Sequence, residues 1–115
     1  MPVSSFRELI VWQRAMELVE EVYKVSAAIP ATERFGLTHQ MQRAAVSIPS
    51  NIAEGRQRKT RKDYAQFLHI ADGSAAELET QLLLAARLYR LTNTKHAHEL
   101  LGEVQKIVGA ILLKL

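Results

Sequence analysis

A proline lies inside a stretch that otherwise has the pattern of one long helix. On both sides of Pro49, apolar residues recur every three or four positions, which is the spacing of a single buried helical face. These residues are Leu37, Met41, Ala44, Ala45, Ile48 and Ile52. Because a helix that ended at Pro49 would have no reason to resume in phase, we predict one helix from Leu37 to Gly55, kinked at Pro49. The proline removes the hydrogen bond to the Ala45 carbonyl, at a cost of roughly 3 kcal/mol.

Short polar side chains surround this proline. Ser47, Ser50 and Asn51 can supply hydrogen bonds to backbone groups that lose their helical partners. Asn51 and Glu54, three residues apart, are the best candidates for a polar site, and Glu79 of the following helix is the residue that would face them. Bonding to freed backbone, or across a subunit contact, explains these groups more readily than an active site does.

The remaining sequence divides into three further helices. The first runs from about Phe6 to Ala28 and stops before a proline, because the residue preceding proline disfavours helical space. The third starts at Thr60, whose hydroxyl can cap the amide of Asp63, and the last runs from about Lys95 to the end of the chain. A short turn is expected near residues 32–33. Short connections between long helices favour antiparallel neighbours, so we predict an all-α, up-down-up-down four-helix bundle.

Length and composition limit the class of protein. A chain of 115 residues has the length of one domain, covering residues 1–115, and buries about two-thirds of its unfolded surface. It contains no cysteine, which excludes disulfides and thiolate chemistry. The first residues lack the apolar region of a secretory signal, and no run of about 18 apolar residues is present. We therefore expect a cytoplasmic protein with no membrane association.

The first and last helices have apolar faces that are wider than one neighbouring helix needs. Each carries two stripes at heptad spacing. On the first helix one stripe is Leu9, Trp12, Met16, Val19, Tyr23 and Ser26, and the second is Val11, Ala15, Leu18, Val22, Val25 and Ile29. The last helix has an inner stripe of Leu100, Val104, Ile107 and Ile111, with Leu101, Val108, Leu112 and Leu115 beside it. Either Ala15, Val22 and Val108 merely flank a thick core, or the extra face forms a homo-oligomer contact, which we favour.

Small residues occupy the middle of the third helix, from Ala71 to Ala76. Among them, Gly73 costs about 1 kcal/mol relative to alanine in a helix. Close approach of another backbone would explain this glycine. We expect the bend at Pro49 to lean toward this thin section.

All of the positive net charge comes from one segment. The net charge is +3, but residues 1–55 and residues 63–115 each sum to −1. The segment 56–62 between them holds five basic side chains and no acidic one: Arg56, Arg58, Lys59, Arg61 and Lys62. Such groups can neutralise phosphates and bind RNA or DNA by releasing counterions. The alternative is a solvated turn between two helices.

Signatures of catalysis and of cofactor binding are missing. None of the four histidines has a glutamate three positions earlier, as a di-iron bundle would require. His96 and His98 are two residues apart and would point to nearly opposite sides of a helix. The glycines form no phosphate-binding loop, and no Gly-x-Ser-x-Gly nucleophile motif occurs. We therefore expect no enzymatic activity, no cofactor and no metal.

Several runs of sequence carry a family resemblance. They are Phe6–Gln13, Glu33–Thr38, Gln42–Gly55, Phe67–Ser74 and Glu77–Leu82. Together they resemble the bacterial four-helix bundle proteins named after 23S rRNA intervening sequences, over roughly residues 6–91. The Ser-Ile-Pro-Ser-Asn-Ile-Ala-Glu-Gly run is the most specific part. The residues that match the family motifs are Arg43, Pro49, Asn51, Glu54, Gly55 and Glu79.

The resemblance implies a four-helix bundle that assembles as a ring, with a pentamer as the leading form. It implies no known reaction, because most members have no assigned function. Some members are encoded within inserts in ribosomal RNA genes, and a related group serves as accessory proteins of diversity-generating retroelements. Those look like basic pentamers that bind nucleic acid and a reverse transcriptase. We thus favour a non-catalytic nucleic-acid adaptor that uses residues 56–62, with a protein-binding scaffold as the alternative.

Overall fold

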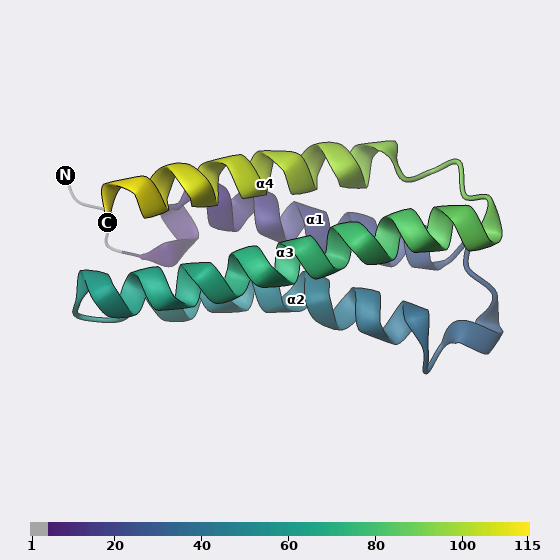
Figure 1. The fold of residues 1–115 in the computed structure, drawn as a ribbon, viewed down its shortest axis with the longest axis horizontal. Coiled ribbons are helices and arrows are strands. Elements are labelled where there is room, and N and C mark those ends of the chain that lie inside the picture. The colour runs from purple at the N-terminus through teal and green to yellow at the C-terminus, as the bar shows by residue number, and fades with distance from the viewer. Residues whose placement is uncertain (1–4) are drawn as a thin grey trace.

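The computed structural model describes residues 5–115, and every regular element in that range is helical. The four long helices are α1 (Ile10–Ser26), α2 (Leu37–Arg56), α3 (Arg61–Tyr89) and α4 (Lys95–Lys114). Two short 3-10 turns, η1 (Phe6–Glu8) and η2 (Ala31–Glu33), precede α1 and α2. Successive helices run in opposite directions (Figure 1), so the predicted up-down-up-down four-helix bundle is confirmed. The expectation about an N-terminal signal falls partly on residues 1–4, outside the described range.

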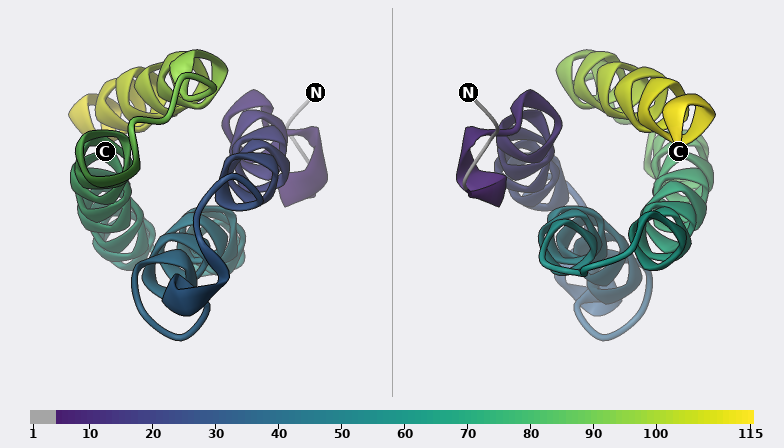
Figure 2. Two further views of the ribbon diagram at one scale, coloured as in Figure 1. Left: turned by 90° about the vertical axis from the view of Figure 1, so that its right-hand side faces the viewer. Right: turned by 90° about the vertical axis from the view of Figure 1, so that its left-hand side faces the viewer.

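Each helix packs against two others around a common core. Helix α1 contacts α2 and α4, and α3 contacts the same two helices from the other side. Viewed along the long axis, the four helices therefore enclose the core like the corners of a square (Figure 2). The most extensive contact is between α2 and α3, and the bundle measures 45 × 22 × 21 Å. This seam positions most of the polar side chains discussed below.

Helix α1 starts later than predicted. The sequence pattern places its start at Phe6, but residues 6–8 form the 3-10 turn, Leu9 is extended, and the α-helix begins at Ile10. The side chain of Ser5 caps the turn by accepting a hydrogen bond from a backbone amide. The ring of Phe6 then packs edge-on against Trp12, with ring centroids 5.3 Å apart. This local cap and ring contact stabilise a separate turn, and α1 also ends two residues earlier than expected.

Helix α2 passes through Pro49 without a break, so the prediction of one continuous helix is confirmed. Pro49 is buried, and hydrogen-bonding side chains follow it. The hydroxyl of Ser50 donates to the Val46 carbonyl at 2.8 Å, and Asn51 Nδ2 donates to the Ser47 carbonyl at 2.8 Å. Proline leaves the Ala45 carbonyl without its helical donor, and the Val46 and Ser47 carbonyls are the next two along the chain. The kink at Pro49 stays a prediction.

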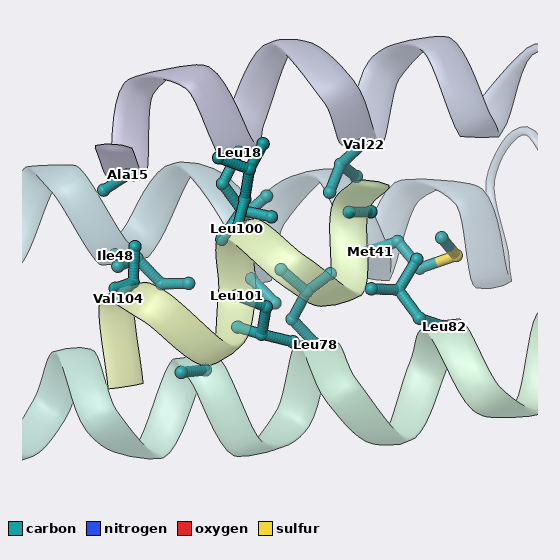
Figure 3. Packing of buried hydrophobic residues seen from close by; sticks show 14 of the residues in the cluster. Ala15, Leu18, Val22, Met41, Ile48, Leu78, Leu82, Leu100, Leu101 and Val104 are labelled. Carbon is teal, nitrogen blue, oxygen red and sulfur yellow. The ribbon is translucent and has the colours of Figure 1, made fainter. Parts of the chain in front are cut away.

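The core uses the stripe of α1 that the sequence analysis treated as secondary. Ala15, Val22 and Val108, expected to flank the core in a thick monomer, are at most 1% exposed and belong to it. By contrast, Met16 and Tyr23 of the other stripe are 42% and 49% exposed. Leu9, Trp12 and Val19 of that other stripe are partly buried and pack against the edge of the core. Figure 3 shows the buried stripe of α1 meeting residues from the other helices, among them Met41, Ile48, Leu78, Leu82, Leu100, Leu101 and Val104.

The inner face of α4 is also rotated relative to the prediction. Leu100 and Val104 are buried as expected, but Ile107 and Ile111 of the same stripe are only partly buried. Leu101 and Val108, from the neighbouring stripe, are buried in their place. The buried face therefore lies between the two predicted stripes. As a result, α1 and α4 each keep apolar side chains on the side that faces solvent.

The close helix approach occurs at a different glycine from the one predicted. A methyl group added at Gly73 would meet nothing within 4 Å, so the expected close contact there is wrong within this chain. At Gly55, the same methyl group would lie 2.8 Å from Cβ of Phe67 and 3.1 Å from Cδ1 of Tyr64. Gly55 is therefore the position where α2 and α3 need the absence of a side chain.

The carboxylate of Glu33 forms hydrogen bonds that hold the connection between α1 and α2 in place. Glu33 Oε1 accepts a hydrogen bond from the Leu37 amide at 3.4 Å, and Oε2 accepts one from the Tyr89 hydroxyl at the end of α3. A methyl group at Gly36 would lie 2.7 Å from Glu33 Oε1. The glycine thus makes room for the carboxylate that satisfies the first turn of α2.

We expect Gly55→Ala to lower the free energy of unfolding by about 1 to 3 kcal/mol, because the new methyl group must displace the Phe67 backbone region. Gly73→Ala is the matched control. It should raise the free energy of unfolding by up to about 1 kcal/mol, since alanine has the higher helix propensity and meets no neighbour. Urea denaturation followed by circular dichroism measures both values. Equal effects of the two substitutions would contradict the close approach at Gly55.

Tyr89 should make stability fall in alkaline solution. Its hydrogen bond to Glu33, together with burial and the negative charge of Glu33, raises the pKa of Tyr89 above the ordinary value of 10.0. A group with a raised folded-state pKa contributes fully below its unfolded pKa and loses that contribution as pH rises through the folded value. We expect wild type to lose more free energy of unfolding than Tyr89→Phe between about pH 9 and pH 12. Both proteins retain Tyr64, whose pKa burial also raises, so parallel pH curves would contradict this role.

Candidate nucleic-acid interface

The basic segment forms a tight connection at one end of the bundle. Helix α2 closes with the Gln57 amide donating to the Ala53 carbonyl, and the Arg58 amide donates to the Gly55 carbonyl at 3.0 Å. The next helix starts at once, because Thr60 Oγ1 accepts a hydrogen bond from the backbone amide three residues later at 3.1 Å. This confirms the predicted cap. The connection at residues 57–60 and the helix ends on either side of it thus bring five cations close together.

Two of these cations are held against the bundle. Arg58 Nη2 lies 3.5 Å from Glu54 Oε1, and its guanidinium stacks over the Phe67 ring at 4.8 Å from the centroid. Arg56, the last residue of α2, is half-buried near Tyr64. Burial raises the pKa of the Tyr64 hydroxyl, and the positive charge of Arg56 opposes that rise. Both arginines therefore have defined positions.

The other three cations face solvent. Lys59, Arg61 and Lys62 are exposed, and none of them forms an ion pair with any residue in the range 5–115. Arg61 and Lys62 occupy the first turn of α3, where the helix dipole is positive. Like charge at a positive helix end is unfavourable, and Asp63 in the same turn offsets part of it, so an added anion would compensate for the remaining positive charge.

Further basic residues belong to elements at the same end. Figure 1 shows that η1 and the last turn of α4 lie at the end where α2 connects to α3. Arg7 is in η1, which also contacts α2, and Lys114 is the last residue of α4. The guanidinium of Arg7 lies 5.1 Å from the Phe6 ring centroid. Because Glu8 of η1 balances the charge of Arg7, Lys114 is the cation that these two elements add to the segment identified from sequence.

The structure does not bring the predicted polar candidates together. Asn51 Nδ2 donates to Ser47 Oγ at 3.0 Å, whereas Glu54 pairs with Arg58. Glu79 faces α4 instead, where its Oε1 accepts a hydrogen bond from Gln105 Nε2 at 3.1 Å. The expectation that Glu79 meets Asn51 and Glu54 is therefore wrong. It lies on the flank of α3 that turns toward α4 rather than toward α2.

A polar groove along the α2–α3 seam was missed by the sequence analysis. It has a volume of about 290 Å³. Its lining residues are Gln40, Arg43, Ala44, Ser47, Ser74, Glu77 and Gln81. The hydroxyls of Ser47 and Ser74 are hydrogen-bonded across the seam at 2.8 Å. Polar residues three or four apart on both helices are the signal that could have predicted it.

Two further hollows are apolar and lie on different sides of the bundle. The first, here the α1–α2 groove, has about 360 Å³ and is lined by Trp12, Met16, Val19, Val46, Pro49, Ser50 and Ala53. The second, here the α4 surface, has about 420 Å³ and is lined by Lys106, Ile107, Ala110, Ile111 and Lys114. Each contains apolar side chains from the wide faces of α1 or α4 that the core does not fully bury.

Within residues 5–115, no three side chains of the metal-ligating types His, Cys, Asp and Glu gather closely enough to hold a metal ion. None of the helices in that range combines the length and apolar character needed to cross a bilayer.

Comparisons with known proteins give one family and one fold. The model of the 23S rRNA-intervening sequence protein family matches residues 7–112. A solved structure from Bacteroides thetaiotaomicron VPI-5482, of a protein with unknown function from the S23 ribosomal protein family, is similar with a TM-score of 0.81. At 24% sequence identity it covers 90% of this chain and 98% of its own, which shows a shared fold. No curated protein matches the chain.

Proposed function

We propose that this chain, which belongs to the 23S rRNA-intervening sequence protein family, is a non-catalytic, oligomeric adaptor that binds RNA or DNA. The observation that carries the proposal is the group of exposed cations between α2 and α3. Lys59, Arg61 and Lys62 have no ion pair within residues 5–115, so phosphates would not have to displace an existing partner. Cytoplasmic location follows from this role.

Binding would be directed at the phosphate backbone. A phosphate beside Arg61 and Lys62 would offset their repulsion with the positive end of α3 and release counterions from the nucleic acid. Arg58, held by Glu54 and the Phe67 ring, would donate from a fixed position. No exposed aromatic side chain lies within residues 56–62, so base stacking is not part of this mechanism.

One copy of this segment would bind weakly, and assembly would strengthen it. Several copies on one particle raise the effective concentration of each second contact. The α1–α2 groove and the α4 surface are different apolar surfaces of one chain, which favours a head-to-tail contact and hence a closed ring. Glu20 lies beside exposed Met16 on α1, whereas Lys106 and Lys114 border the α4 surface, so charges of opposite sign would meet. A pentamer is the favoured ring, following the family resemblance.

A protein-binding scaffold is the second candidate. The α1–α2 groove supports it, because its lining is mostly apolar and a partner helix could lay an apolar face into it. In that case the basic segment would be a solvated turn, and nucleic-acid binding would be absent even at low salt.

Replacing Arg56, Arg58, Lys59, Arg61 and Lys62 with glutamine should abolish salt-sensitive binding to labelled RNA and DNA. Fluorescence anisotropy at several salt concentrations measures this. Each lost phosphate contact should reduce the slope of log K against log salt by about 0.7 for single strands and about 0.9 for duplex DNA. A matched control replaces five basic residues of the opposite end: Lys24, Arg34, Arg87, Arg90 and Lys95. Equal losses for both variants would mean that binding is not localised to residues 56–62.

One glutamate placed in either apolar surface should prevent ring formation, and mixing the two variants should show whether the contact is head-to-tail. Val46→Glu in the α1–α2 groove and Ala110→Glu on the α4 surface should each give monomers by light scattering. A mixture of the two variants should form a dimer, because each retains the surface that the other has lost. The substitution His69→Glu, at an exposed position outside both surfaces, should leave the mass unchanged. A mixture that stays monomeric would contradict a head-to-tail contact.

A further inference from the structure

The two walls of the polar groove differ in hydrogen-bonding character. On the α2 side, Arg43 presents a guanidinium group, which only donates hydrogen bonds. On the α3 side, Glu77 presents a carboxylate and Gln81 a side-chain oxygen, and both accept hydrogen bonds. Glu77 and Gln81 are four residues apart, so they lie on the same face of α3. The groove therefore has a positive, donating wall opposite a negative, accepting wall.

One acceptor in this groove has no partner. Gln81 Oε1 is buried and receives no hydrogen bond from any residue in the range 5–115. Leaving a buried acceptor unsatisfied costs about 1 to 3 kcal/mol. Among the other lining residues, the hydroxyls of Ser47 and Ser74 are hydrogen-bonded to each other. Because this oxygen of Gln81 has less than 1 Å² of accessible surface, the Gln81 side chain would have to rotate toward the groove before a ligand could donate to Oε1 and recover this cost.

The floor of the groove is ordered by side-chain hydrogen bonds. Asn51 Nδ2 donates to Ser47 Oγ at 3.0 Å, and the hydroxyls of Ser47 and Ser74 are 2.8 Å apart. Ser74 is only 7% exposed. The Ser47–Ser74 bond joins α2 to α3 about one helical turn from Arg43 and Glu77, so it holds together the two helices that carry the walls. A fixed, polarised groove loses little entropy when a small ligand enters it.

We propose that this groove binds a free α-amino acid in its zwitterionic form. The ligand carboxylate would accept hydrogen bonds from Arg43, and its ammonium group would donate to Glu77 and, once the Gln81 side chain rotates toward the groove, to Gln81 Oε1. Charge-assisted hydrogen bonds of this kind are the strongest that side chains provide. A volume of about 290 Å³ accommodates a small amino acid, and no aromatic side chain lines the groove to stack a nucleobase.

This site is separate from the basic segment and independent of the proposed adaptor function. Arg43 and Arg58 are about four helical turns apart along α2 and its connection. An amino acid in the groove would tie α2 to α3 more firmly. It would stabilise the protein by mass action, because the unfolded chain has no such groove.

The test is isothermal titration calorimetry on the full chain with single L-amino acids, supported by thermal shift. Acetate and methylamine serve as half-ligands, since each lacks one of the two charged groups. We expect saturable binding of at least one amino acid, with both half-ligands at least about tenfold weaker. Absence of saturable binding by any of the twenty at about 10 mM, tenfold above a millimolar dissociation constant, would overturn the proposal.

Variants separate ligand binding from structural effects. Arg43→Gln and Glu77→Gln should each weaken binding at least about tenfold, whereas Asp72→Asn, exposed on α3 outside the groove, should not change it. Gln81→Met should abolish binding yet leave the ligand-free protein as stable or more stable, because it removes the unsatisfied acceptor. A loss of oligomer mass in Arg43→Gln or Glu77→Gln would instead identify the groove as a subunit contact and overturn the proposal. The five-glutamine variant of residues 56–62 should bind the amino acid like wild type, whether or not nucleic acid is bound.

Discussion

The packing of α2 against α3 is the interaction on which the other features depend. At Gly55 the two helices come so close that a methyl group would collide with Phe67, and farther along Ser47 and Ser74 join them by a hydrogen bond. Close packing at this end allows the short connection that gathers the basic residues. The same seam sets the width of the polar groove. One contact between consecutive helices thus determines both the position of the cations and the shape of the groove.

Charge and apolar surface are separated on this bundle. The basic connection lies at one end, whereas the α1–α2 groove and the α4 surface lie along its sides. Assembly through the sides would leave residues 56–62 accessible, so oligomer formation and phosphate binding would share only Lys114, which borders the α4 surface. In a ring whose subunits are related by rotation about a common axis, every copy of residues 56–62 would lie at the same height along that axis. The proposed adaptor would then offer nucleic acid a repeated set of cations.

Much of the fold could be predicted from the sequence, because helix caps and periodicity are local signals. The continuity of α2 through Pro49 and the Thr60 cap followed from such patterns. The rotation of α1 was not predictable, since both of its apolar stripes fit a helix equally well and only packing decided between Ala15 and Met16. The prediction for the partner of Glu79 was wrong for a related reason. Which neighbour Glu79 meets depends on where α4 lies against α3. The polar groove required two helices to be aligned, which one sequence does not specify.

The connectivity of the bundle also has a consequence for how it forms and opens. The largest contact joins α2 and α3, which are consecutive in the chain and separated only by residues 57–60. Such local contacts close with little loss of chain entropy and are associated with fast folding. The contact between α1 and α4 joins the two ends of the chain and must close the longest loop. Amide hydrogens of the α2–α3 hairpin would therefore exchange most slowly, while the α1–α4 edge would be the first part of the bundle to open.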